Sequence, residues 1–554
     1  MRLTDTLAEM VHDAIANAQT AGDLPQFDIP TIAIERPKDA SHGDYATTMA
    51  LRMARLARMK PRSIAEAIVA HAQPPEQVSE MNIAGPGFIN IRLSDMYVQQ
   101  LVEMILLQGA DFGRIVTGDG KRAQVECVSA NPTGPITIGR TRGGIIGDTL
   151  ARLMRAAGYD VELEYYYNDA GAQIDKLGQA CKIRYLQALG QEAELDADLY
   201  QGAYLIDIAN DLVKEHGDKL VDEPSDHFAT IAKTIISAQQ KASLHRIGIF
   251  HDSYFNESSI HEDGRLNEAL EQLNQNGYIY QKEGAWWLKT TAFGDEKDRV
   301  AIRSTDGTTT YRMNDIVYHW DKAMRKFDVV VDIFGSDHHE VAKEVKIGVQ
   351  MLGYDVSFVH TLIHQFVNLI REGKEVKMST RRGVYETLDD LADEVGPDPI
   401  RYFMLQRSAN SRINFDLDLA LEHSDKNPVY YIQNAHVRCA GILRKWQEAG
   451  NALEDDANAD LSLLDHPKEI AFLKKALELS EVIELSVDNY EPHHIAFYAY
   501  DLAAAFHPVY DACRVMGDGV SAEQSLARLR FYKAAKVLMA RVLDLMGMSA
   551  PERM

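Results

Sequence analysis

The sequence predicts three parts: an α+β N-terminal domain, a central α/β domain with a doubly wound parallel sheet, and an all-α C-terminal helical bundle. Two observations support this. At 554 residues the chain is too long for a single hydrophobic core. After about residue 118 the pattern becomes strand, glycine-rich turn, helix and strand, which is the unit of a doubly wound sheet, and after about residue 420 it is helical throughout.

The first part, residues 1–113, alternates helical patterns with one strand pattern. Apolar residues recur at helical spacing in 51–56 and 64–68, and FINIRL at 88–93 alternates as a strand does. The turn GDGK at 118–121 then marks a new start. We therefore expect domains at 1–113, 114–425 and 426–554.

The central part begins with a strand at 125–128, a helix through Ile146 to Met154 and a strand at 161–167. A helical stretch from about 175 to 276 follows, within an insertion expected at about 175–285. The sheet pattern resumes with a strand from 286, a buried parallel strand at 327–334 and a helix at 340–351. In the last part, helix breaks are expected at Pro428, Pro467, Pro492 and Pro508.

Composition narrows the class of protein. The formal charge is −24, from 58 basic and 82 acidic residues, which argues against charge-driven binding to nucleic acid in general and against a DNA partner. The negative charge does not exclude the binding of one specific RNA, because a local basic surface can lie on an acidic protein. The four cysteines form no CxxC pair, so no disulfide framework and no structural metal are expected. No apolar run approaches the ~20 residues that span a bilayer, and the N-terminus resembles no signal peptide. We expect a cytoplasmic protein without a membrane partner.

The glycine-rich turn is NPTGPITIGRTRGG, from Asn131 to Gly144. Its prolines fix the backbone, its glycines allow a ligand to approach closely, and the positive end of the following helix favours an anion. The turn contains neither GxGxxG nor GxxxxGK[ST], so dinucleotide and P-loop binding lack support. From the turn alone, a phosphate site and a tight structural crossover are equally possible.

Longer motifs show a family resemblance. ANPTGPITIGRTRGGIIGD at 130–148, YQGAYLIDIA at 200–209, the TYRMND region within 298–322, VKMSTRRG at 376–383 and NPVYYIQNAH at 427–436 resemble arginyl-tRNA synthetases. The resemblance extends over essentially the whole chain. It implies a Rossmann-like class I catalytic domain, an N-terminal additional domain that contacts the D-loop of tRNA, and a helical anticodon-binding domain.

The resemblance also implies a reaction. An arginine–tRNA ligase activates L-arginine with Mg-ATP to arginyl-adenylate and transfers it to the 2′-hydroxyl of the terminal adenosine of its tRNA. We expect a monomer whose partners are ATP, L-arginine and the tRNA for arginine. Two alternatives remain: a non-catalytic tRNA-binding paralogue with a decayed phosphate motif, and another class I synthetase. A cysteine enzyme would need zinc-binding thiols and a glutamate enzyme a basic pocket, and neither is found in the sequence.

The ATP residues follow from two motifs. At 137–140 the sequence is TIGR, where the family usually has histidines at the first and last positions. Thr137 can donate a hydrogen bond, and Arg140 brings a permanent cation. The segment from Lys377 to Arg381 resembles the mobile KMSKS loop, whose cation stabilises the leaving pyrophosphate. The catalytic candidates are Thr137, Gly139, Arg140, Lys377, Ser379 and Arg381, and the ATP-binding candidates are Pro132, Gly134, Gly139, Gly143, Asp148, His338, Lys377 and Met378.

The other candidates bind arginine and tRNA. Carboxylates recognise a guanidinium in a fork geometry, and the four-residue spacing of Tyr311 and Asp315 puts them on one helical face. By resemblance the arginine-binding residues are Glu126, Ser129, Asn131, Tyr311, Asp315 and Asp337. The tRNA-binding candidates are Phe88, Asn90, Tyr430 and Asn434, with Tyr431 and His436 as further anticodon candidates and Arg401, Arg407 and Arg412 for the acceptor stem or phosphates.

Overall fold

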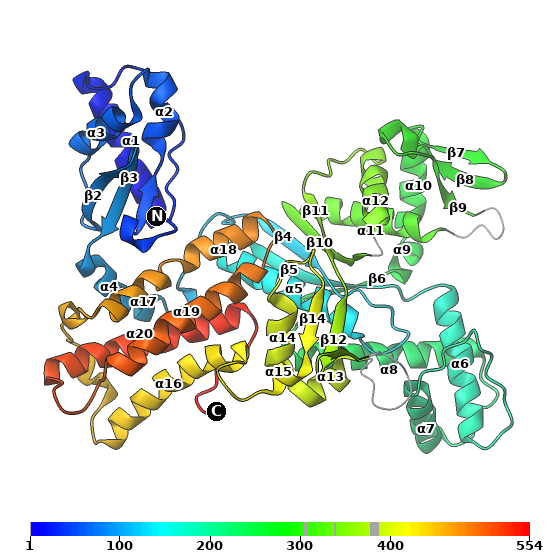
Figure 1. Ribbon diagram of the computed structural model, residues 1–554. Helices are drawn as coiled ribbons and strands as arrows, with labels where there is room; N and C mark the ends of the chain where they lie inside the picture. The colour runs from blue at the N-terminus through cyan, green and yellow to red at the C-terminus, as the bar shows by residue number, and fades with distance from the viewer. Residues whose placement is uncertain (1, 304–308, 337–338, 377–386) are drawn as a thin grey trace.

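The computed structural model describes residues 2–303, 309–336, 339–376 and 387–554. Figure 1 shows an N-terminal domain that stands on a C-terminal helical bundle, with the central sheet and its insertions on the other side of the bundle. This agrees with the α+β, α/β and all-α parts expected from the sequence. No helix among the described residues combines the length and the apolar character needed to cross a membrane.

The N-terminal domain packs three helices against a small antiparallel sheet of order β1-β3-β2. The predicted strand is β3, Phe88–Leu93, and it buries Ile89, Ile91 and Leu93 on one face. Its alternation leaves Phe88 and Asn90 on the other face. The elements are α1 (Leu3–Ala21), β1 (Tyr45–Thr47), α2 (Met49–Ala57), α3 (Pro61–His71), β2 (Val78–Ala84), β3 and the connecting α4 (Asp95–Gln108).

The central sheet is parallel, with strand order β11-β10-β4-β5-β6. Helix α5 (Ile138–Ala156) connects the first two strands in the sequence, β4 and β5, and helix α12 (His339–Met351) connects β10 to β11. From β4 the sheet is built outward in both directions, so the winding reverses between β4 and β10. The strands are β4 (Arg122–Glu126), β5 (Asp160–Tyr167), β6 (Ser253–Asn256), β10 (Val329–Gly335) and β11 (Val359–His364).

One expectation for this part was wrong. The stretch 175–276 was expected to be helical, but it contains β6, which pairs with β5 at the edge of the sheet. Two insertions therefore flank β6. The first holds α6 (Ala172–Ala188), α7 (Tyr204–His216) and α8 (Ser225–Arg246). The second holds α9 (Ser258–Glu262), α10 (Arg265–Gln275), the antiparallel strands β7 (Ile279–Lys282), β8 (Ala285–Leu288) and β9 (Arg299–Ile302), and α11 (Tyr311–Met324).

The chain then forms a mixed three-stranded sheet and the helical bundle. The linking elements are β12 (Val367–Arg371), β13 (Lys374–Glu375), α13 (Leu388–Val395), α14 (Pro397–Leu405), β14 (Ile413–Asp416) and α15 (Leu417–Leu421). The bundle helices are α16 (Pro428–Glu448), α17 (Pro467–Ala476), α18 (Leu479–Asp488), α19 (His493–Ala512) and α20 (Ala522–Leu545). Short 3-10 helices lie at Ala40–His42, Gly109–Asp111, Thr290–Phe293, Leu453–Asp456 and Leu461–Leu463.

Three of the four prolines expected to break helices stand at helix starts. Pro428 and Pro467 are the first residues of α16 and α17, and Pro492 precedes α19. The fourth expectation was wrong, because Pro508 lies inside α19. Its neighbours Phe506 and Val509 are completely buried, so packing within the bundle holds the helix together across the missing N–H group.

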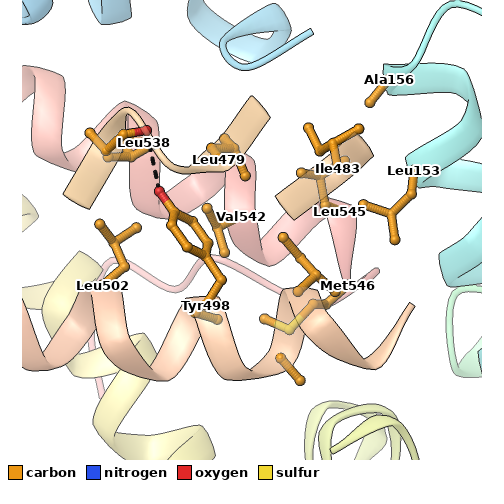
Figure 2. Close-up of a cluster of buried hydrophobic side chains, with 14 of the residues drawn as sticks. Leu153, Ala156, Leu479, Ile483, Tyr498, Leu502, Leu538, Val542, Leu545 and Met546 are labelled. Atoms are coloured by element: carbon orange, nitrogen blue, oxygen red, sulfur yellow. Dashed lines mark hydrogen bonds between the residues drawn. The ribbon is translucent and has the colours of Figure 1, made fainter. Parts of the chain in front are cut away.

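Helix α5 joins the central domain to the bundle. Figure 2 shows Leu153 and Ala156 of α5 facing Leu479 and Ile483 of α18, with Leu545 and Met546 beside them. All six side chains are buried and belong to one continuous core. The central sheet and the bundle are therefore packed together through apolar contacts.

The N-terminal domain is joined to the bundle in two ways: the apolar side of α4 packs against α17 and α20, and charged side chains link the rest of the domain to α17 and α18. The Arg36 guanidinium lies 2.7 Å from a Glu481 carboxylate oxygen, and the Tyr45 hydroxyl donates to the same carboxylate at 2.8 Å. The Lys474 ammonium lies 2.8 Å from Asp44. Figure 1 shows this junction between the blue domain and helices α17 and α18.

Candidate active site

A cavity of about 270 Å³ lies where β4, β10 and β11 meet helices α11 and α12. Glu126, the last residue of β4, opens onto it. The sheet reverses its winding here, and open α/β sheets bind their ligands at such points. The predicted site residues that line the cavity are Glu126, Ser129, Asn131, Arg140, Tyr311 and Asp315.

The exit of β4 has an unusual backbone. Val128 and Ser129 have φ values of 69° and 40°, in the left-handed region that non-glycine residues rarely adopt. The resulting bend directs the Ser129 hydroxyl back to Glu126, to which it donates a hydrogen bond at 2.8 Å. Strained backbone of this kind persists where surrounding contacts fix it, and it is concentrated at functional sites.

Asp315 supplies a carboxyl group without a hydrogen-bonding partner. It lies one turn after Tyr311 on α11, and among the described residues no group donates a hydrogen bond to its carboxyl oxygens. The pKa of Asp315 is raised to about 7, mainly by burial and also by the nearby carboxylates of Glu257 and Glu126, against the lowering effect of His319 and Lys322. A cation entering the cavity would stabilise the ionised form.

Next to Asp315 lies a cluster of buried polar and charged side chains. The Lys322 ammonium contacts Glu126 Oε2 at 2.6 Å and Asp332 Oδ1 at 2.6 Å. His319 Nε2 lies 3.0 Å from Asp332 Oδ2. Burial alone would raise the pKa of the Asp332 carboxyl, but its contacts with Lys322 and His319 hold this pKa below its ordinary value. Glu126 is therefore a charged group that already has protein partners.

The glycines of the predicted phosphate turn have different roles. A Cβ at Gly139 would meet no atom within 4 Å, so this part of the turn is open to a ligand. A Cβ at Gly143 would come within 2.9 Å of His364 Nε2, and one at Gly144 within 2.8 Å of the Val128 side chain. The latter two glycines let α5 pack closely, whereas Gly139 leaves space beside its N-terminus.

Thr137 caps α5, and Arg140 lies in its first turn. The Thr137 side chain accepts a hydrogen bond from the Arg140 N–H at 3.5 Å. Within the described parts of the chain, the Arg140 guanidinium has no ion pair or hydrogen bond, and it reaches the cavity wall. A fixed cation thus stands between the open helix end and the acidic cavity, where an anion and a cation can bind side by side.

The first insertion supports the turn. The Gln240 amide on α8 donates to the carbonyl oxygens of Asn131 at 2.9 Å and Gly134 at 2.6 Å. The Tyr204 hydroxyl on α7 donates to the Thr133 carbonyl oxygen. The Asn131 side chain itself donates to Gln173. The opposite side of the turn is fixed by the Leu388 N–H, which donates to the Ile136 carbonyl at 2.8 Å.

Some predicted residues do not reach the cavity. Asp148 is buried on the bundle side of α5, where it pairs with Arg401 and with Arg152 at 2.8 Å. The expectation that Arg401 contacts tRNA was wrong, because its side chain is completely buried and also donates to the Ile247 carbonyl. His436 is buried against the Pro551 carbonyl. Asp337, His338, Lys377, Met378, Ser379 and Arg381 lie outside the described residues.

The sequence did not single out several residues of the cavity wall. Tyr318 and Lys322 extend the α11 face that Tyr311 and Asp315 begin, so a polar stripe along that helix was an available signal. No such signal marks Asp332, which sits inside an otherwise apolar strand. Tyr166 and Asn168 of the wall belong to the stretch that resembles the family, although no role was predicted for them. The wall residues that the sequence did not indicate include Gln173, Tyr318, His319, Asp332, Lys346 and Thr361.

The predicted tRNA residues lie on two separate surfaces. Phe88, 39% exposed, is at the start of β3 on the face that also carries Asn90. Tyr430 and Asn434, one turn apart on α16, are half-buried. Tyr431 instead packs against His507, with ring centres 4.3 Å apart.

Three family models match the chain. The arginyl tRNA synthetase N terminal domain matches residues 5–93, the catalytic domain of class I tRNA synthetases (R) matches 101–404, and the DALR anticodon binding domain matches 432–554. Together they cover the three parts of the fold.

Curated relatives match from end to end. An arginine–tRNA ligase from Listeria welshimeri is 42% identical over 99% of this chain and 98% of its own length. One from Bacillus subtilis is 40% identical over 100% of this chain and 99% of its own.

Solved structures show the same fold. The arginyl-tRNA synthetase of Thermus thermophilus matches with a TM-score of 0.73 at 22% identity, and coverage is 100% of both chains. That of Plasmodium falciparum matches with a TM-score of 0.74 at 16% identity, over 100% of this chain and 99% of the other. With a matching family model in each part of the fold and relatives about 40% identical over its whole length, the chain belongs to the arginyl-tRNA synthetases, class I aminoacyl-tRNA synthetases.

Proposed function

We propose that the protein is an arginine–tRNA ligase. A carboxylate oxygen of L-arginine attacks the α-phosphorus of ATP, the bond to the bridging oxygen breaks, and pyrophosphate leaves. The 2′-hydroxyl of the terminal adenosine of tRNA then attacks the carbonyl carbon of the adenylate, and AMP leaves. End-to-end relatives that are arginine–tRNA ligases support this activity over a non-catalytic role and over a cysteine or glutamate enzyme.

The observation that carries the proposal is the free carboxyl of Asp315 in the cavity wall. A guanidinium needs a carboxylate that can accept two parallel N–H bonds, and among the described cavity residues Asp315 has all its acceptors available. The Tyr311 hydroxyl and Glu126 flank it as further acceptors. Asn131 and Ser129 lie at the β4 end of the cavity, where we place the ammonium and carboxylate of the amino acid.

ATP is placed at the N-terminus of α5. The open space at Gly139, the positive end of the helix and the Arg140 guanidinium favour phosphate groups there. We place Pro132 and Gly134 at the edge of this ATP site. We also propose that ATP or the amino acid contacts Lys377, Met378, Ser379, Arg381, His338 and Asp337. His364, whose ring lies against Gly143, is a further proposed ATP contact. Mg²⁺ arrives with ATP as part of the co-substrate.

The tRNA is placed across two domains. We propose domain limits of 1–113, 114–425 and 426–554, with Phe88 and Asn90 contacting the D-loop and Tyr430 and Asn434 on the anticodon side. The match to a DALR anticodon binding domain over residues 432–554 supports the second placement. We further propose a monomeric, cytoplasmic enzyme that binds no DNA.

The test is ATP–pyrophosphate exchange driven by arginine, measured with and without tRNA for arginine. We expect exchange with arginine and none with lysine, citrulline or glutamate. Exchange that is absent even with cognate tRNA would refute catalysis, and exchange driven by glutamate would refute the acidic pocket.

Arg140 tests the ATP placement. Arg140→Ala is expected to raise the KM for ATP and to lower exchange by about tenfold or more, since a charge-assisted hydrogen bond contributes roughly 1.5–3 kcal/mol. Arg140→His should retain most of the activity because the family commonly uses histidine there. The matched control is Arg62→Ala, an exposed arginine of the N-terminal domain. If Arg140→Ala is neutral, other groups hold the phosphates.

A further inference from the structure

We propose that Lys322 is a positioning residue of the arginine pocket. Its ammonium group bridges the Glu126 and Asp332 carboxylates, so that Asp315 is the carboxylate left to pair with the substrate's guanidinium. This inference rests on the proposed function, and it concerns which charge the pocket accepts.

Lys322 is completely buried at the inner end of the α11 polar face. Its Nζ lies 2.6 Å from Glu126 Oε2, 2.6 Å from Asp332 Oδ1 and 4.3 Å from the centre of the Tyr318 ring. Lysines are almost never completely buried unless their charge is paired. The ammonium therefore joins β4 and β10 at the point where both strands reach the cavity.

The side chains around the Lys322 ammonium are of the kinds that bind a metal cation. Oxygen and nitrogen atoms of Glu126, Asp332 and His319 lie within 4.8 Å of one another. In many proteins such a set binds a metal ion, but here the ammonium of the chain bridges both carboxylates. The chain itself thus supplies the cation that these acids require.

His319 supplies a second contact to the Asp332 carboxylate. Its Nδ1 lies 2.8 Å from the Asp315 carbonyl oxygen, and its Nε2 lies 3.0 Å from the Asp332 carboxylate. The ring therefore links the backbone of α11 at Asp315 to Asp332 on β10 and holds that carboxylate beside the Lys322 ammonium.

Glu126 and Asp332 have a cationic partner inside the protein, whereas the Asp315 carboxyl has none among the described residues. The Lys322 ammonium bridges the first two carboxylates, and Asp332 also contacts His319. Asp315 is therefore the carboxyl group with which the guanidinium of the substrate can pair. Without Lys322 the buried carboxylates would lose their ammonium partner, and Glu126 would lose the bond that fixes its Oε2. Arginine would then meet a displaced carboxylate.

The experiment compares Lys322→Met, Asp332→Asn and the double variant in arginine-dependent exchange with cognate tRNA. We expect Lys322→Met to raise the KM for arginine at least about tenfold and to change the KM for ATP by less than about twofold, because the lost charge pair lies at the amino-acid end of the site. The double variant removes one charge of each sign and should recover most of the arginine KM.

Lys214→Met, at an exposed lysine that pairs with Asp211 on α7, is the matched control and should behave as wild type. If Lys322→Met does not fold, the double variant is compared with Asp332→Asn alone, and it should have the lower arginine KM. The inference is overturned if Lys322→Met leaves the KM for arginine unchanged or raises the KM for ATP equally. It is also overturned if the double variant has an arginine KM no lower than that of Lys322→Met. Where Lys322→Met does not fold, the same comparison is made with Asp332→Asn. A wild-type protein without arginine-dependent exchange would instead refute the proposed function.

Discussion

Asp315 couples the ionisation of one side chain to the occupancy of the cavity. Burial raises its pKa to about 7, so near neutral pH the empty site holds a mixture of protonated and ionised carboxyl. The unfolded chain releases this proton near its ordinary value of 3.8. Between these two values the folded state therefore binds more protons, and rising pH lowers the free energy of unfolding through this group.

Arginine binding should show the opposite trend. If the guanidinium pairs with ionised Asp315, as we propose, binding releases a proton below pH 7, and the KM for arginine should fall by up to about tenfold per pH unit as pH rises toward 7. Above pH 7 it should level off. Initial rates measured from pH 5.5 to 8.5 test this.

Asp315→Asn should raise the KM by roughly 10- to 100-fold and remove this pH dependence, because the loss of charge-assisted bonds to the guanidinium weakens binding at every pH. Asp211→Asn, on the exposed face of α7, serves as the control. A profile in Asp315→Asn that keeps the wild-type slope would assign the titration to another group.

At the scale of one element, the glycines of α5 have two roles: those in its middle allow close packing, and Gly139 leaves open space at its N-terminus, where we propose that phosphate groups bind. Its middle glycines allow close contact with the exit of β4, where a Cβ at Gly147 would come within 2.5 Å of the Cys127 Cβ. Its first turn leaves Gly139 open. The helix can thus approach the strained exit of β4 closely while its N-terminus remains free for phosphate groups.

Two alanine variants should separate these roles. Gly147→Ala should lower the free energy of unfolding by about 1–3 kcal/mol through overpacking, and it should move the end of β4 that carries Glu126. Gly139→Ala should leave stability unchanged or slightly higher, as alanine favours the helix, while raising the KM for ATP. Urea unfolding and exchange kinetics on both variants distinguish the effects. A destabilised Gly139→Ala with normal ATP kinetics would contradict the assignment.

At the scale of the whole molecule, the sheet and the bundle share one core. Leu153→Ala, at a completely buried contact between α5 and α18, should lower the free energy of unfolding by about 2–5 kcal/mol. Leu107→Ala, at a leucine 89% exposed on α4, is the control and should have little effect. Urea unfolding followed by tryptophan fluorescence, with Trp446 in the bundle and Trp320 in the central domain, shows whether both parts lose stability together. A loss confined to the central domain would mean that the two parts fold independently.

The sequence predicted the repeated local patterns and missed what depends on distant segments. The first βαβ unit, β10 and the Tyr311–Asp315 face follow from periodicity, and all are present. The four-residue β6, half-buried at a sheet edge after the long helix α8, is too short to have a recognisable period. Arg401 looked like a surface cation because its partners come from segments about 150 to 250 residues away in the sequence. Likewise, only the fold brings Lys322 to Glu126.

The charged junction between the N-terminal domain and the bundle has a consequence for how that domain behaves in the cell. Its ion pairs, Arg36 with Glu481 and Lys474 with Asp44, are partly exposed, so dissolved salt screens them, whereas it leaves the apolar contact between α5 and α18 intact. Rising ionic strength should therefore weaken this junction first, while the apolar side of α4 keeps its contacts with α17 and α20. The part of the N-terminal domain before α4 would then change its orientation with the ionic surroundings, while the central sheet stays packed on the bundle.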